Sequence, residues 1–141
     1  MKKCILSVFL SVALLFVLSA CSFGSNHSGP QKQTYYPQYS VKDNVCIKNE
    51  AGEVLLNSTH FESVQVLETD KRPSVLLMFT DEGQDLFNQA VSENINKTLD
   101  LCVGDEVITS PKIMAETTGR SVTISTDTLK EAEDIVNKVK K

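Results

Sequence analysis

The stretch that decides the fold is residues 74–95, "SVLLMFTDEGQDLFNQAVSENI", because its hydrophobic pattern changes period at Thr80. Up to Phe79 the residues are mostly apolar, which predicts a buried strand. From Thr80 onward the apolar residues recur at helical spacing, which predicts an amphipathic helix; they are Leu86, Phe87, Ala90, Val91 and Ile95. Thr80 suits the N-cap, and Asp81 and Glu82 suit the first turn, where the helix dipole favours negative charge. A strand that leads directly into a helix indicates a mixed domain.

Further short strands are predicted on both sides of this stretch. Residues 45–57 and 98–113 each have two apolar runs around a turn that contains glycine, which predicts two hairpins. Residues 62–69 form another strand, separated from the one before Thr80 by the polar turn "DKRP". A last strand is predicted at residues 120–126.

The chain closes with a second predicted helix, "TLKEAEDIVNKVKK", residues 128–141. Thr128 and Glu131 have the spacing of a capping box, and the apolar residues behind them form one stripe. The order of the elements predicts an α+β fold. We expect a single two-layer domain over residues 41–141, with a mostly antiparallel sheet and two helices on one face.

The N-terminal residues have the layout of an export signal. Residues 1–20 contain two early lysines, an apolar run and small residues at the end, and "LSAC" at 18–21 resembles the lipobox of bacterial lipoproteins. We therefore predict a lipoprotein signal peptide and a lipid on Cys21; the alternatives are a transmembrane anchor or ordinary cleavage that leaves a free cysteine. Residues 21–40, rich in Ser, Gly, Gln and Pro, are predicted to be a flexible tether. Ser22 favours the outer membrane if the organism is Gram-negative.

Charge and composition exclude several kinds of site. Removing residues 1–20 takes away two lysines and changes the formal net charge from -4 to -6, which disfavours nucleic acid as a partner. His27 and His60 have no partners at ligand spacing, so no metal site and no histidine base is predicted. Asp81, Glu82 and Asp85 could be paired carboxylates for acid–base chemistry, but their place in the first turn of a helix already explains them. The sequence predicts no catalytic residues, no cofactor and no small-molecule substrate.

Two cysteines fall within the predicted domain. Cys46 and Cys102 each lie in a predicted strand, and an even pair in an oxidising compartment is typical of a disulfide. A Cys46–Cys102 disulfide and two separately buried thiols both fit the sequence.

The order of the motifs resembles a known family. Residues 75–113, "VLLMFTDEGQDLFNQAVSENINKTLDLCVGDEVITSPKI", and residues 117–140, "TTGRSVTISTDTLKEAEDIVNKVK", are similar to the head subdomain of the first periplasmic domain of SecD, an accessory subunit of the Sec translocase. The resemblance extends upstream through residues 49–66. It departs from the family pattern at the turns Gly104-Asp105 and Gly119-Arg120, and there is no room for the base subdomain or for transmembrane helices. The resemblance implies the fold, an extracytoplasmic address and contact with polypeptides, but not transport driven by a proton gradient.

These observations together predict a membrane-anchored extracytoplasmic lipoprotein that binds a polypeptide or a partner protein without catalysis. The expected partner is an envelope protein or an extended polypeptide, held by the addition of a strand to an open sheet edge. The alternatives are a structural or regulatory lipoprotein that docks onto an envelope complex and, third, an envelope enzyme.

Overall fold

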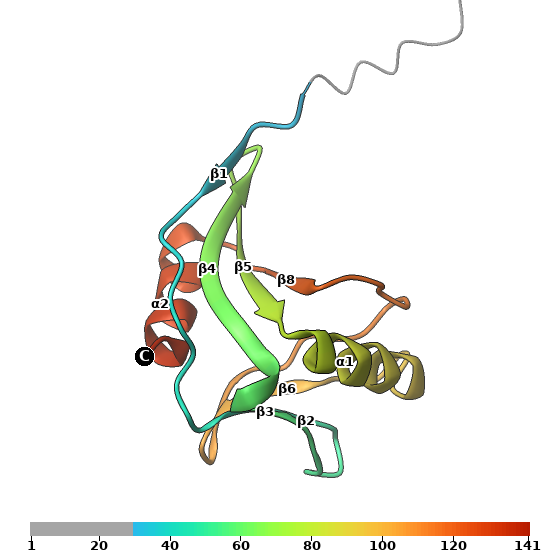
Figure 1. Cartoon of the computed structure of the whole chain (residues 1–141). Coiled ribbons are helices and arrows are strands. Elements are labelled where there is room, and N and C mark those ends of the chain that lie inside the picture. The colour runs from blue at the N-terminus through green and yellow to red at the C-terminus, as the bar shows by residue number, and fades with distance from the viewer. Residues whose placement is uncertain (1–29) are drawn as a thin grey trace, which may run out of the picture. The chain divides into compact units, whose positions relative to one another are not determined.

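The computed structural model describes residues 30–141, so Cys21 and the predicted signal peptide lie outside the described residues. The described part contains eight strands, two α-helices and one short 3-10 helix (Figure 1). In chain order they are β1 (Gln33–Tyr35), β2 (Val45–Lys48), β3 (Val54–Asn57), η1 (Ser58–His60), β4 (Phe61–Thr69), β5 (Arg72–Phe79), α1 (Asp81–Glu93), β6 (Asp100–Val103), β7 (Glu106–Thr109), β8 (Ser121–Ser125) and α2 (Leu129–Val139).

The predicted α+β class is confirmed, and the strands divide between two sheets where one was expected. The first sheet has the order β1-β4-β5-β8 and the second the order β3-β2-β6-β7, and every neighbouring pair is antiparallel. The chain passes from the second sheet to the first through η1, which joins β3 to β4. Each predicted hairpin is present. Which hairpins pair with one another depends on contacts between distant residues, which local sequence patterns do not report.

Both helices begin at the predicted caps. The Thr80 hydroxyl accepts a hydrogen bond from Gly83 N at 3.1 Å, and the Thr128 hydroxyl accepts one from Glu131 N at 3.1 Å. The Glu131 carboxylate accepts from Asp127 N at 3.0 Å, one residue before the position that a capping box uses. α2 packs on β4 and β5, whereas α1 packs against β3, η1 and β5 (Figure 1).

The fold begins before residue 41, where the sequence analysis placed the start of the domain. β1 pairs with β4, Tyr36 N donates to Val66 O at 3.1 Å, and Tyr39 forms a β-bridge with Val64. The ammonium of Lys140 lies 4.5 Å from the centroid of the Tyr39 ring, a cation–π contact. The last part of the segment predicted as a tether is therefore part of the folded unit.

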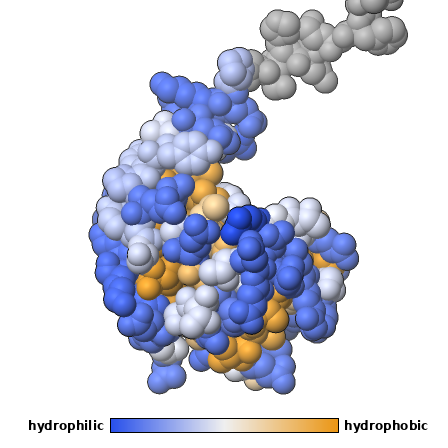
Figure 2. All heavy atoms as spheres, viewed as in Figure 1, coloured by the Kyte–Doolittle hydropathy of each residue, from blue (hydrophilic) through white to orange (hydrophobic). Residues whose placement is uncertain are grey.

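Aromatic rings connect α1 to the first sheet. The Phe79 ring is fully buried, and its centroid lies 4.6 Å from that of Phe87 on α1 and 5.7 Å from that of Phe61 on β4. These stacked and tilted aromatic contacts add to the gain from apolar burial. Outside this core, Figure 2 shows a surface that is mostly hydrophilic, with separate hydrophobic patches.

Candidate functional site

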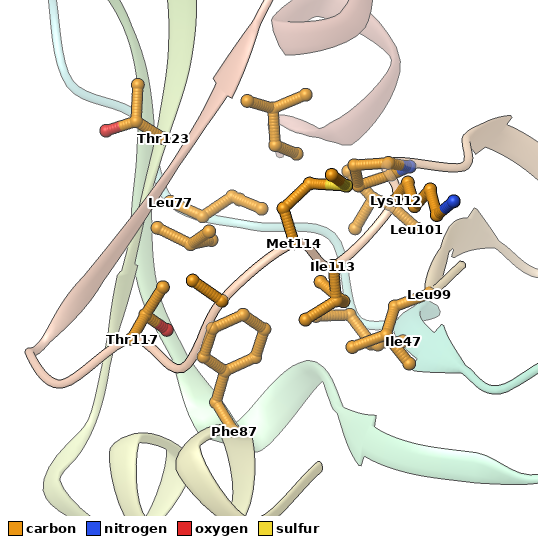
Figure 3. A pocket seen from close by; sticks show the side chains of 14 residues that line it. Ile47, Leu77, Phe87, Leu99, Leu101, Lys112, Ile113, Met114, Thr117 and Thr123 are labelled. Carbon is orange, nitrogen blue, oxygen red and sulfur yellow. The ribbon is translucent and has the colours of Figure 1, made fainter. Parts of the chain in front are cut away.

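An apolar cavity of about 250 Å³ lies between the β8 side of the first sheet and the inner face of the second sheet. Figure 3 shows side chains from both sheets, from α1 and from the connection between β7 and β8 around this space. Leu77, Val122 and Ile124 come from the first sheet, Ile47 and Leu101 from the second. Phe87, Leu99, Pro111, Lys112, Ile113, Met114, Ala115, Thr117 and Thr123 complete the lining.

The connection between β7 and β8 forms one wall of the cavity. Its first part is fixed by backbone hydrogen bonds. Ile113 N donates to Lys97 O at 2.8 Å and Ile113 O accepts from Asn96 N at 2.8 Å. Within the described residues, no hydrogen bond of this kind holds residues 114–119. Met114, in this freer part, lines the cavity and is 71% exposed. Few backbone hydrogen bonds and an exposed apolar side chain are features of a segment with low local stability.

The size and chemistry of the cavity indicate what it can bind. Pockets for small molecules occupy about 300–1,000 Å³, and this cavity is smaller. Its lining is almost entirely aliphatic and aromatic, with Lys112, Thr117 and Thr123 as the polar residues. A cavity of this kind accepts one or two apolar side chains, and it offers no pair of groups for acid–base chemistry.

The two cysteines of the domain lie opposite one another. Cys46 on β2 and Cys102 on β6 are direct partners in the antiparallel ladder, and both are free thiols in the structure. Cys102 is buried and Cys46 is partly exposed. Burial, followed by the neighbouring Cys46, raises the pKa of the Cys102 thiol. The register places the two thiols on the same face of the second sheet.

Of the polar residues that the sequence analysis weighed, His27 lies outside the described residues, whereas Asp81 and His60 make contacts near the surface. The Asp81 carboxylate, on an 88% exposed side chain, lies 2.8 Å from the Arg120 guanidinium. His60 Nδ1 accepts a hydrogen bond from Asn57 N at 3.1 Å, so this histidine helps to cap the start of η1. In residues 30–141 there is no group of three or more His, Cys, Asp or Glu side chains suited to a metal ion. No helix in that range is long and apolar enough to cross a membrane.

The sequence analysis did not identify the cavity. Its lining comes from segments far apart in the chain, from Ile47 to Ile124, and no local period connects them. One local signal was present: Met114 is an apolar residue just beyond the predicted hairpin at residues 98–113, in the connection between β7 and β8.

The fold and the cavity define a class: a small α+β domain with an apolar cavity between its two sheets. The family model for the P1 head subdomain of SecDF matches residues 32–141. The chain belongs to this family.

Two solved structures are similar to the described fold. One is "Crystal structure of SecDF in Super-membrane-facing form", with a TM-score of 0.52 and 29% sequence identity over 62% of this chain. The other is "Structure and function of a membrane component SecDF that enhances protein export", with a TM-score of 0.51 and 29% identity over 62% of this chain. The matches cover 12% and 40% of those chains, respectively. No curated protein matches the sequence.

Proposed function

We propose that this protein is a membrane-anchored, extracytoplasmic module that binds apolar segments of polypeptides without catalysis. The observation that carries the proposal is the apolar cavity between the two sheets, which is suited to side chains and is bounded by a wall with few backbone bonds. Membership of the SecDF P1 head family supports it, because a related structure is described as a membrane component that enhances protein export.

The anchor is proposed on separate grounds. A lipid on Cys21 would hold the domain at one membrane surface. Two or more acyl chains give lasting membrane attachment, whereas a single chain does not. A binding site of weak affinity gains from this arrangement, since tethering raises the effective concentration of targets on the same membrane. The proposed targets are envelope proteins or secreted chains with exposed apolar segments.

Binding can be tested with an apolar peptide that carries a fluorophore and a photo-reactive residue. The protein is the full-length chain in phospholipid nanodiscs, with empty nanodiscs as the blank. The variant Val122→Asp places a charge at the cavity wall and should weaken binding at least about tenfold, because a carboxylate loses solvation there. The matched variant Val107→Asp alters a valine that is 51% exposed on β7 and does not line the cavity, so binding should be unchanged.

The crosslink site provides a readout that does not depend on either variant. Crosslinked peptide should map to cavity residues such as Ile113, Met114 or Val122. Equal binding by both variants, together with crosslinks elsewhere on the surface, would contradict the proposal.

A further inference from the structure

Two hydrogen bonds that flank the β5–β8 pairing show which residues of β8 are hydrogen-bonded to β5 and which are not. Phe79 N donates to Arg120 O at 2.7 Å before β8 begins, and Thr126 N donates to Pro73 O at 3.1 Å after β8 ends. Opposite residues of an antiparallel pair alternate between hydrogen-bonded and non-hydrogen-bonded positions. The bonded positions of β8 are therefore Val122 and Ile124, which face Leu77 and Val75 in the register.

The other residues of β8 present their main chain outward. The N–H and C=O groups of Ser121, Thr123 and Ser125 point away from β5, because these residues occupy the non-bonded positions. Within residues 30–141, no hydrogen bond of the structure involves these groups. β8 thus has an open edge with the donors and acceptors of an unpaired strand.

The remaining outer strands are less suited to accept another strand. β1 has 3 residues, and β3 and β7 have 4 residues each. The pairing of β3 and of β7 is also interrupted by register shifts, at Ile47/Lys48 and Leu101/Cys102. β8 has 5 residues and no register shift, and it carries neither the lysine nor the proline that often protects an edge.

The open edge and the apolar cavity are continuous. The side chains of Val122 and Ile124, which alternate with the edge residues, line the cavity. A strand added beside β8 would place its residues opposite Val122 and Ile124 with side chains on the same face, toward the cavity. Figure 3 shows this space between β8 and the connection that carries Ile113 and Met114.

We propose that β8 binds an extended polypeptide segment as a fifth strand of the first sheet, with apolar side chains at alternate positions entering the cavity. This inference rests on the proposed function and adds the conformation and the sequence pattern of the bound segment. Main-chain hydrogen bonds supply affinity with little demand on sequence, and the cavity selects apolar residues at positions i and i+2. The intervening residues face away from the cavity and are free to be polar.

The first test is an N-methyl scan of a peptide with alternating valine and threonine, measured against the full-length chain in nanodiscs. In an added strand, successive N–H groups point alternately toward β8 and toward solvent. Methylation of one alternate set should weaken binding at least about tenfold, since it removes hydrogen bonds and introduces a clash, and methylation of the other set should have little effect. An isomeric peptide with its valines grouped together should also bind more weakly.

The second test alters the protein edge. Ser125, which does not line the cavity, also occupies a non-bonded position of β8, and Ser125→Pro removes an outward N–H that makes no bond to β5, so the ladder keeps its hydrogen bonds. We expect at least about tenfold weaker binding for Ser125→Pro and unchanged binding for Ser125→Thr, which keeps the N–H. A melting curve checks that the proline variant is folded. The N-methyl scan uses the unaltered protein, so it tests the inference even if the proline variant does not fold.

The outcomes separate this inference from the proposed function. Peptide binding that crosslinks to the cavity, but responds equally to methylation at every position, would overturn strand addition and leave the binding function in place. Absence of binding by every apolar peptide would overturn both.

Discussion

The turn between β4 and β5 shows how one residue accepts an unfavourable conformation. Asp70 and Lys71 have φ angles of 50° and 63°, as a two-residue hairpin turn requires. The left-handed region is unfavourable for lysine by about 1–2 kcal/mol, whereas glycine adopts it without this cost. Lys71→Gly should therefore raise the free energy of unfolding by about 0.5–1 kcal/mol, after the greater unfolded entropy of glycine is subtracted. Urea unfolding followed by circular dichroism measures the gain, and Lys71→Ala, which keeps a Cβ, should show none.

Gly83 illustrates the opposite case, in which a glycine is needed inside a helix. A Cβ at Gly83 would overlap the carbonyl oxygen of His60, which accepts a hydrogen bond from Thr80 N at 3.1 Å. Alanine is favoured over glycine in helices by about 1 kcal/mol, and overpacking costs about 1–3 kcal/mol. We expect Gly83→Ala to lower the free energy of unfolding by about 1 kcal/mol, measured by urea unfolding. The exposed Ser92→Ala on the same helix should be neutral or stabilising, and a stabilised Gly83→Ala would show that η1 moves freely from α1.

At the scale of elements, the sequence predicted what neighbouring residues determine. The apolar stripes of α1 and α2, the caps at Thr80 and Thr128, and the hairpins all follow from local spacing. The division into two sheets did not follow, because β2 pairs with β6 across about fifty residues of chain. The cavity could not be predicted for the same reason, because residues from both sheets line it and they come together only when the sheets have formed.

The pairing of β2 with β6 sharpens the prediction of a Cys46–Cys102 disulfide. Directly opposite residues in an antiparallel pair have Cα atoms about 4.5–5.5 Å apart, within the range of about 4.4–6.8 Å that a disulfide allows. In protein from the oxidising envelope, mass spectrometry without reduction should find the two residues linked. The link closes a long loop and should stabilise by roughly 4 kcal/mol if unstrained, so reduction should lower the melting temperature.

The matched control for the disulfide is Cys46→Ser, whose melting temperature should not respond to reduction. In the reduced protein, the raised pKa of Cys102 should make this thiol slow to alkylate near pH 8 until the chain is denatured. Rapid alkylation of both thiols in native protein taken from the envelope would contradict the disulfide.

For the whole molecule, the proposed anchor and the cavity serve one function. The folded unit begins at Lys32, so ten residues, 22–31, separate it from Cys21. If these residues form the flexible tether that their composition predicts, their root-mean-square reach is about 20 Å. The β8 edge would then stay within a short distance of one membrane surface, where an exported chain is also present. Weak, sequence-tolerant binding is sufficient there, because the effective concentration of the target is high.

The anchor itself is the prediction on which this arrangement depends. Cys21→Ser removes the thiol that would take the lipid, so metabolic labelling with a radioactive or clickable palmitate should mark the parent protein and leave the variant unlabelled. Because the lipoprotein peptidase cuts only after lipid addition, the variant should keep residues 1–20 and show the mass of the precursor. Cys46→Ser should label and mature normally, since this residue lies on β2 within the domain. A labelled and matured Cys21→Ser protein would show that another residue holds the lipid, and an unlabelled parent protein would contradict the lipid anchor.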